Sequence, residues 1–219
     1  MELSEKLYLS VKDIWDSYNE HPFVKGIEIG NLDIDKFRFY MIQDYLYLLE
    51  YSRVFALGIV KAKDEEIMRL FAESVNSILN GETNIHKSYM NRLGISKEEV
   101  EKAKASIDNI SYTNYMLSVA QSQGLLELIV SVLSCSWSYK LIADKINERS
   151  NAINHEFYGE WVKGYVSEEY AKSNDIIINL VNKLGKNITN EELDNLIDIF
   201  RNCSRYEYMF WDMAYNKKN

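Results

Sequence analysis

The sequence is poor in residues that interrupt helices, with one proline and nine glycines among its 219 residues. Such a shortage favours long helices joined by short connections. No convincing run shows the two-residue alternation of apolar and polar side chains that is typical of half-buried strands. We therefore predict an all-α fold, a multi-helix bundle forming a single domain over residues 1–219.

Cysteine and positive charge are also scarce. The two cysteines, Cys135 and Cys203, are too few for a disulfide framework, and reduced thiols in a cytoplasmic protein are the simplest interpretation. A net charge of −8 and a pI near 5.1 argue against a nucleic-acid partner. The N-terminus lacks the basic and apolar regions of a signal peptide. No run approaches about 18 uncharged apolar residues, so we expect no membrane span.

Apolar residues at helical spacing, with start and stop signals, predict most of the bundle. The predicted helices cover residues 4–18, 36–64 with Asp35 as the cap, 65–80, 84–93, 112–122, 125–148, 157–164, 167–184 and 191–214. The segment 21–30 holds the only proline and is predicted to be a connection. Ser96 and Glu99 have the spacing of a capping box before a short helix.

One predicted helix face carries a carboxylate. Asp44, Tyr47 and Tyr51 are spaced by three and four residues and therefore share a face of an otherwise apolar helix. A buried carboxylate is costly unless it is paired or hydrogen-bonded. Two interpretations remain open here, a ligand-binding carboxylate and a structural one that bonds to a neighbouring tyrosine or to the backbone.

Cys135 and Tyr139 are four residues apart and share a second helix face. A nucleophilic cysteine needs a thiolate and a nearby proton acceptor. No histidine lies within four residues of Cys135, so the fold would have to supply a partner. A lone cysteine is more often a small core residue, and this alternative stays open.

Glu207 lies among aromatic residues near the C-terminus, three residues before Phe210 and four before Trp211. An apolar environment disfavours a charged carboxylate, which would suit Glu207 to proton transfer near neutral pH. The alternative is an aromatic core helix with Glu207 at its edge, and the local pattern alone favours that alternative.

Glu82 and His86 are four residues apart and could be two metal ligands on one helix. A dinuclear iron site in a bundle needs more carboxylates and histidines from other helices, and the chain has three histidines in all. A solvated helix pair is therefore the preferred interpretation, and we expect no metal. The sequence also lacks Walker and GxGxxG motifs, so nucleotide binding has no local support.

Taken in order, these segments resemble the TenA family, the thiaminase II aminopyrimidine hydrolases. The resemblance runs from HPFVKGIEIGNLDIDKFRFYMIQDYLYLLEYSRVFALGIVKA through ETNIHKSYMNRLGIS, SYTNYMLSVA, SCSWSYKLI and YGEWVKGYVSEEY to YEYMFWDMAY. It implies a haem-oxygenase-like helical bundle, assembled as a homotetramer, without haem, metal or other cofactor. It also implies hydrolysis of 4-amino-5-aminomethyl-2-methylpyrimidine to the hydroxymethyl pyrimidine and ammonia, and cleavage of thiamin, in thiamin salvage.

The resemblance also assigns roles to individual residues. By position in the family motifs, Cys135 corresponds to the nucleophile, Glu207 to the acid/base, Asp44 to the carboxylate that anchors the aminopyrimidine, and Tyr47, Tyr112, Tyr139, Tyr165 and Phe210 to substrate-binding residues. Cys135 also places the chain in the family branch that has this cysteine.

Two neighbours of Cys135 depart from the family pattern. Many members have proline at the position of Ser134 and an aromatic residue at that of Ser136. Two other functions remain as alternatives, a non-catalytic or regulatory helical protein and a metal-dependent oxidase of the same architecture.

Overall fold

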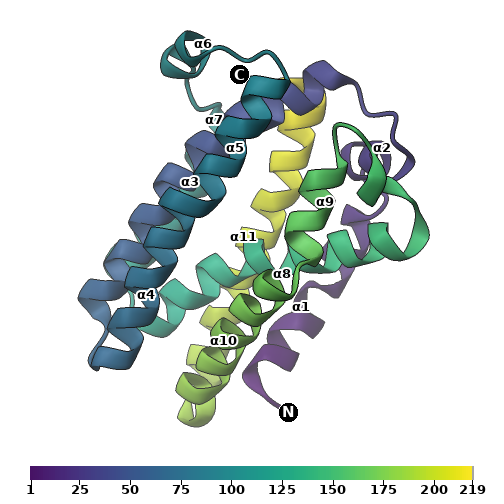
Figure 1. Ribbon diagram of the computed structural model, residues 1–219. Helices are drawn as coiled ribbons and strands as arrows, with labels where there is room; N and C mark the ends of the chain where they lie inside the picture. Colours follow the sequence, from purple (N-terminus) through teal and green to yellow (C-terminus); the bar gives the residue numbers. More distant parts are fainter. Residues whose placement is uncertain (219) are drawn as a thin grey trace. The chain divides into compact units, whose positions relative to one another are not determined.

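The computed structural model describes residues 1–218, except for the side chains of residues 84 and 85. Within these residues the regular structure is entirely helical, and no strand occurs (Figure 1). The prediction of an all-α fold is confirmed.

The chain divides into two compact units. The first comprises Met1–Leu32 and Ile129–Trp211, and the second comprises Asp33–Leu128 and the C-terminal segment from Asp212. Two long helices, α8 (Leu125–Arg149) and α11 (Asn190–Asn216), contribute residues to both units. The single domain over residues 1–219 stays a prediction.

Besides its share of α8 and α11, the first unit contains six short and medium helices. These are α1 (Leu3–Tyr18), α2 (Pro22–Ile29), η2 (Ala152–Asn154), α9 (Gly159–Val166), α10 (Glu168–Leu184) and η3 (Gly185–Asn187). α1 packs against α10. Leu7, Val11 and Trp15 recur at helical spacing and are buried, so they form the apolar stripe of α1. The indole of Trp15 contacts Phe200 of α11 and Trp137 of α8.

The prediction that residues 21–30 form a connection is wrong, because α2 occupies most of this segment. The backbone N–H of Phe23 donates to Nδ1 of His21, which caps the helix at 3.1 Å. Pro22 stands at the first helical position, where its missing N–H costs no hydrogen bond. Gly30 ends the helix with a left-handed φ of +73°. The residues that suggested a break therefore mark the two ends of a helix.

Besides its share of α8 and α11, the second unit is organised around one long helix. Its helices are α3 (Ile34–Lys61), α4 (Glu65–Ser77), η1 (Ile78–Glu82), α5 (Thr83–Arg92), α6 (Lys97–Lys102) and α7 (Ile107–Ser122). α3 packs against α4, α5 and α7 (Figure 1). A Cβ at Gly58 would lie 2.3 Å from the ring of Phe71, so glycine permits the close approach of α4 to α3.

Several helix ends differ from the prediction. Asp33, rather than Asp35, caps α3, since its carboxylate accepts from the Asp35 N–H at 2.8 Å. The last residues of the predicted helix 65–80 belong to the π-helical segment η1, which continues to Glu82. α7 begins at Ile107 rather than at residue 112, because Ser106 caps it.

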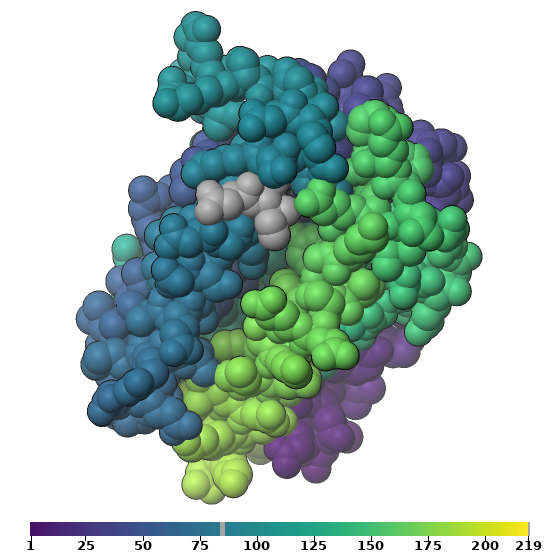
Figure 2. Space-filling model, viewed as in Figure 1, coloured from purple at the N-terminus to yellow at the C-terminus, as the bar shows by residue number. Residues whose placement is uncertain are grey.

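The short helix α6 begins as predicted, with the Glu99 N–H donating to Ser96 Oγ at 3.1 Å. α6 has no buried residue, and it stands out from the surface of its unit (Figure 2).

By length and composition alone, α8 is long and apolar enough to cross a membrane. The core helix of a globular protein meets the same test, and 56% of the most apolar window of α8 is buried within the structure. α8 therefore fits the pattern of a core helix.

Candidate active site

The Asp44 carboxylate lies on α3, and the residue is only 5% exposed. Its Oδ2 lies 2.6 Å from Nε2 of His86 on α5, and the hydroxyl of Tyr40 donates to the same oxygen at 3.4 Å. A charge-assisted hydrogen bond of this length is strong in a buried setting. The expectation that a buried Asp44 would need a partner is confirmed, and the partner is a histidine as well as a tyrosine.

His86 is 6% exposed, so the interpretation of Glu82 and His86 as a solvated pair is wrong. Its Nδ1 lies 2.9 Å from the backbone carbonyl of Glu82, and its Nε2 faces Asp44. Burial by itself lowers the pKa of His86, but the hydrogen bond and negative charge of Asp44 outweigh it and leave the pKa above its usual value. His86 is therefore predisposed to its imidazolium form, with Nε2 directed at Asp44.

Burial raises the pKa of the Glu82 carboxyl to about 7, with the charge of Asp44 adding to the rise and His86 opposing it. Three ionisable groups are thus coupled at the contact of η1, α5 and α3. Nevertheless, among the described residues no three His, Cys, Asp or Glu side chains are arranged to hold a metal ion.

Aromatic rings extend from Asp44 along the buried face of α3. The ring of Tyr47 stacks on Tyr51 at 5.3 Å between centroids, and it also contacts Tyr112 of α7 at 5.3 Å. All three rings are buried. The prediction that Asp44, Tyr47 and Tyr51 share one helix face is confirmed, and Tyr112 joins them from the neighbouring helix.

A polar network fixes α7 against α3 beside Asp44. The side-chain oxygen of Gln43 accepts from the Ser106 N–H at 3.0 Å, and the Asn109 amide donates to the Gln43 carbonyl at 2.8 Å. Gln43 and Asn109 are both buried, so these bonds are protected from water. The network sets the position of Tyr112, one turn beyond Asn109, relative to the Asp44 face.

In the first unit, Cys135 is half-buried on α8, and Tyr139 is buried one turn later. The Tyr139 ring lies 5.0 Å from Tyr165 of α9 and 5.0 Å from Trp211 of α11. The fold thus brings Tyr165 to Tyr139, a contact that sequence spacing could not predict.

Glu207 and Phe210 are both 2% exposed on α11, so Glu207 is not at the edge of its helix. Its charge acts on two buried neighbours. Burial, with the negative charge of Glu207 adding to it, raises the pKa of the Cys203 thiol well above its usual range. Burial and then Glu207 likewise raise the pKa of the Tyr18 phenol, and Cys135 contributes a smaller effect in the same direction. Cys135 and Glu207 therefore both act on Tyr18.

A buried hydroxyl network adjoins Cys135. Ser134 Oγ lies 2.9 Å from Ser204 Oγ of α11, and the indole N–H of Trp15 donates to Ser204 Oγ at 2.9 Å. The Tyr18 hydroxyl donates to the Ser204 carbonyl. Ser134, one of the two departures from the family pattern, thus links the Cys135 turn of α8 to α1 and to the Glu207 region of α11. Ser136 bonds only weakly, to the carbonyl of Leu133 at 3.5 Å.

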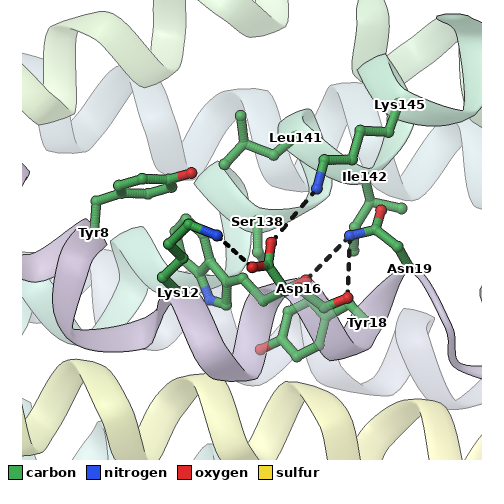
Figure 3. A pocket seen from close by; sticks show the side chains of 10 residues that line it. Tyr8, Lys12, Asp16, Tyr18, Asn19, Ser138, Leu141, Ile142 and Lys145 are labelled. Atoms are coloured by element: carbon green, nitrogen blue, oxygen red, sulfur yellow. Dashed lines mark hydrogen bonds and ion pairs between the residues drawn. The ribbon is translucent and has the colours of Figure 1, made fainter.

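A small cavity of about 50 Å³ lies between α1 and α8, also in the first unit (Figure 3). Figure 3 shows Lys12 and Lys145 pointing toward Asp16, which pairs with both ammonium groups. The described lining includes none of the predicted site residues. The two lysines are compensated by the aspartate, so the cavity offers no strong anion site.

The structure thus places the predicted residues in two groups, each within one unit. Asp44, Tyr47 and Tyr112 belong to the second unit, and Cys135, Tyr139, Tyr165, Glu207 and Phe210 belong to the first. The sequence alone does not pair His86 with Asp44 and does not single out Tyr18. Two features of the sequence could have indicated His86, since the chain has few histidines and a buried carboxylate such as Asp44 needs a partner. No local pattern indicates Tyr18.

A family model described as the TENA/THI-4/PQQC family matches residues 8–217. An aminopyrimidine aminohydrolase of Helicobacter pylori is 46% identical over 215 residues, which cover 98% of this chain and 99% of the relative. An aminopyrimidine aminohydrolase of Halalkalibacterium halodurans is 43% identical over 218 residues, with 100% and 97% coverage.

A comparison with solved structures gives a result consistent with these relatives. A TenA homologue from P. horikoshii superposes with a TM-score of 0.91 at 27% identity, covering 99% of each chain. A protein from Shewanella denitrificans with a haem-oxygenase-like fold gives a TM-score of 0.80 at 16% identity, covering 99% of this chain and 93% of that one. The second likeness concerns the fold alone, and it confirms the predicted haem-oxygenase-like architecture.

Proposed function

The chain belongs to the TENA/THI-4/PQQC family, and on that premise we propose that it hydrolyses 4-amino-5-aminomethyl-2-methylpyrimidine to the hydroxymethyl pyrimidine and ammonia. Cleavage of thiamin is a second activity of the same site, and the role is salvage of the pyrimidine half of thiamin. The observation that carries the proposal is the match over nearly the whole chain to two relatives with this aminohydrolase name. Burial of Asp44 and Glu207 with a half-buried Cys135 supports it.

In the proposed mechanism Cys135 is the nucleophile and Glu207 the proton donor. Direct displacement of an amine is slow because amines leave poorly, and covalent addition divides the step into easier ones. The Cys135 thiolate forms a bond to a ring carbon of the pyrimidine. The displaced ring electrons move to a ring nitrogen, which takes a proton from Glu207.

The second half of the reaction replaces nitrogen by oxygen. The aminomethyl group enters as an ammonium, and the bond from the exocyclic methylene to nitrogen breaks as NH3 leaves with the electron pair of that bond. Water then adds to the methylene carbon and returns a proton to Glu207. Finally the bond between Cys135 and the ring breaks and the ring nitrogen releases its proton to the solvent, which restores the aromatic ring and the thiolate.

The remaining predicted residues bind the substrate. Asp44 accepts a hydrogen bond from the ring amino group, while Tyr47 and Tyr112 supply flat aromatic contact to a flat ligand. Tyr139 and Tyr165 supply polar groups, and Phe210 an apolar wall. Holding the ring in one orientation lowers the barrier by several kcal/mol. No cofactor enters these steps.

The direct test is an assay of purified protein with the aminomethyl pyrimidine, in which released ammonia is measured. Steady release of ammonia at a rate proportional to protein concentration supports the proposal. A non-catalytic or regulatory protein would release none at any concentration. Thiamin should also be consumed, with the hydroxymethyl pyrimidine as a common product.

Chelation of metals should leave the activity unchanged. The proposed steps use a thiolate and a carboxyl group, and the described residues offer no set of three metal ligands. The measurement is ammonia release before and after prolonged dialysis against EDTA. Loss of turnover that iron or zinc restores would instead favour the metal-dependent oxidase alternative.

Replacing Asp44 by asparagine should weaken substrate binding more than it disturbs folding. A hydrogen bond to a charged group contributes about 1.5–3 kcal/mol, so KM should rise by more than about tenfold. The comparison is of KM, kcat and thermal unfolding for Asp44→Asn and wild type. A folded variant with unchanged KM and kcat would remove Asp44 from the binding site.

We also propose that the protein is a cytoplasmic homotetramer. The acidic composition and two free cysteines are compatible with a reducing compartment. Sedimentation equilibrium over a range of concentrations should give the mass of four chains. A stable monomer or dimer would contradict this part of the proposal.

A further inference from the structure

The Asp44–His86 contact restricts where protons can lie. Nδ1 of His86 lies 2.9 Å from the Glu82 carbonyl, which can only accept, so Nδ1 carries a hydrogen. Nε2 lies 2.6 Å from Asp44 Oδ2. If His86 were neutral and Asp44 ionised, Nε2 and Oδ2 would face each other at that distance with a lone pair each and no hydrogen between them. One proton must therefore lie between the two side chains.

The surroundings of His86 favour its imidazolium form. The described groups that face it are the Tyr40 hydroxyl, which donates to Oδ2, and the Glu82 carboxyl. The hydrogen bond to Asp44, the charge of Asp44 and that of Glu82 all raise the pKa of His86 against the opposing effect of burial.

The hydrogen bonds also orient the carboxylate. Within the described residues, His86 and Tyr40 both bond to Oδ2 of Asp44. Oδ1 then keeps its lone pairs for a ligand, and an amino N–H is the group that it can accept. A carboxylate held in this way needs no reorientation when the ligand arrives.

We propose that His86 is a positioning residue, which holds Asp44 by its Oδ2 atom and leaves Oδ1 as the acceptor for the amino group of an aminopyrimidine. The inference rests on the proposed function, because it takes Asp44 as the group that binds the amino edge. His86 acts through Asp44 and makes no contact with the ligand itself.

The test is the binding of 4-amino-5-hydroxymethyl-2-methylpyrimidine, the unreactive product, measured by calorimetry. His86→Leu should weaken binding by at least about tenfold, since it leaves a buried carboxylate without its charged partner. His86→Gln keeps a donor near Nε2 and should recover most of this loss. In the background of Asp44→Asn, His86→Leu should have little further effect, because its only route of action is gone.

The pH dependence separates a positioning role from a structural one. As pH rises through the raised pKa of His86, the imidazolium loses the proton on Nε2 and its lone pair faces Asp44, so wild-type affinity should fall. Glu82→Gln should show the same fall of affinity, but at lower pH, because removal of the Glu82 charge lowers the pKa of His86. His86→Gln should abolish it, measured from about pH 6 to about pH 10.

Three results would each overturn the inference. His86→Leu could bind the product as tightly as wild type does, His86→Gln could keep the fall of affinity with rising pH, or the effects of Asp44→Asn and His86→Leu on affinity could add in the double variant. If His86→Leu does not fold, the pH profile of His86→Gln decides. A further test needs no ligand. Nitrogen NMR of the ligand-free wild type should show a protonated His86 imidazole at about pH 6, and a neutral His86 at this pH would overturn the inference. A wild type that hydrolyses the substrate while these tests fail leaves the proposed function standing, whereas one that neither binds nor hydrolyses it removes both.

Discussion

Replacement of Cys135 by serine should reduce turnover by at least about three orders of magnitude, the scale of loss expected for a covalent nucleophile. A serine hydroxyl stays protonated near neutral pH and is a poorer nucleophile than a thiolate. The two residues differ by one atom, so packing on α8 is nearly preserved. The measurement is ammonia release from the aminomethyl pyrimidine, with thermal unfolding as a check on folding.

Cys203 is the matched control. It is fully buried, and its burial raises the pKa of the thiol well above its usual range, so it stays protonated and inert. Cys203→Ser should therefore keep most of the turnover, at a cost of about 1–3 kcal/mol in stability if the new hydroxyl finds no partner. An active Cys135→Ser variant would contradict the nucleophile assignment.

A thiol-alkylating reagent provides a second comparison of the same two residues. Half-buried Cys135 should react and lose activity, and substrate should protect it, whereas buried Cys203 should not react in the folded protein. The Cys203→Ser variant should be inactivated at the wild-type rate. Inactivation that follows modification of Cys203 would contradict the assignment.

Glu207→Gln should lower kcat by about two orders of magnitude or more, the usual scale for loss of a general acid or base. Glutamine keeps the size of the buried side chain but cannot supply the proton. The limb of the pH–rate profile that belongs to Glu207 should disappear with it. A variant whose profile has the same limbs as wild type would remove Glu207 from proton transfer.

Phe210→Leu is the control for Glu207→Gln, because Phe210 is equally buried one turn away on the same helix. It should weaken binding while leaving the pH–rate profile unchanged. A change of profile in this variant would mean that the limb reports packing rather than a proton on Glu207.

Most helices could be predicted because their apolar residues follow the period of the helix, as Leu7, Val11 and Trp15 do in α1. α2 could not be recognised by counting breakers, since Pro22 and Gly30 are compatible with helix ends as well as with loops. The π-helical turn Ile78–Glu82 has no distinct local pattern, so the sequence predicts its first residues as the end of an ordinary helix over 65–80.

The candidate site shows the same division between local and tertiary information. The shared face of Asp44 and Tyr47 follows from spacing along one helix, and so does that of Cys135 and Tyr139. The contact of Asp44 with His86 joins residues 42 positions apart and depends on the packing of α5 against α3. No rule of spacing reaches across such a distance.

The reaction itself is tested most directly by mass spectrometry of the pyrimidine product formed in water enriched in oxygen-18. Ammonia alone is ambiguous, because the substrate carries both a ring amino group and an aminomethyl group. The proposed function predicts 4-amino-5-hydroxymethyl-2-methylpyrimidine with one labelled oxygen on the methylene carbon, in equal amount to the ammonia released. Recovery of unchanged substrate, or of a product that has lost the ring amino group and kept the aminomethyl group, would contradict it.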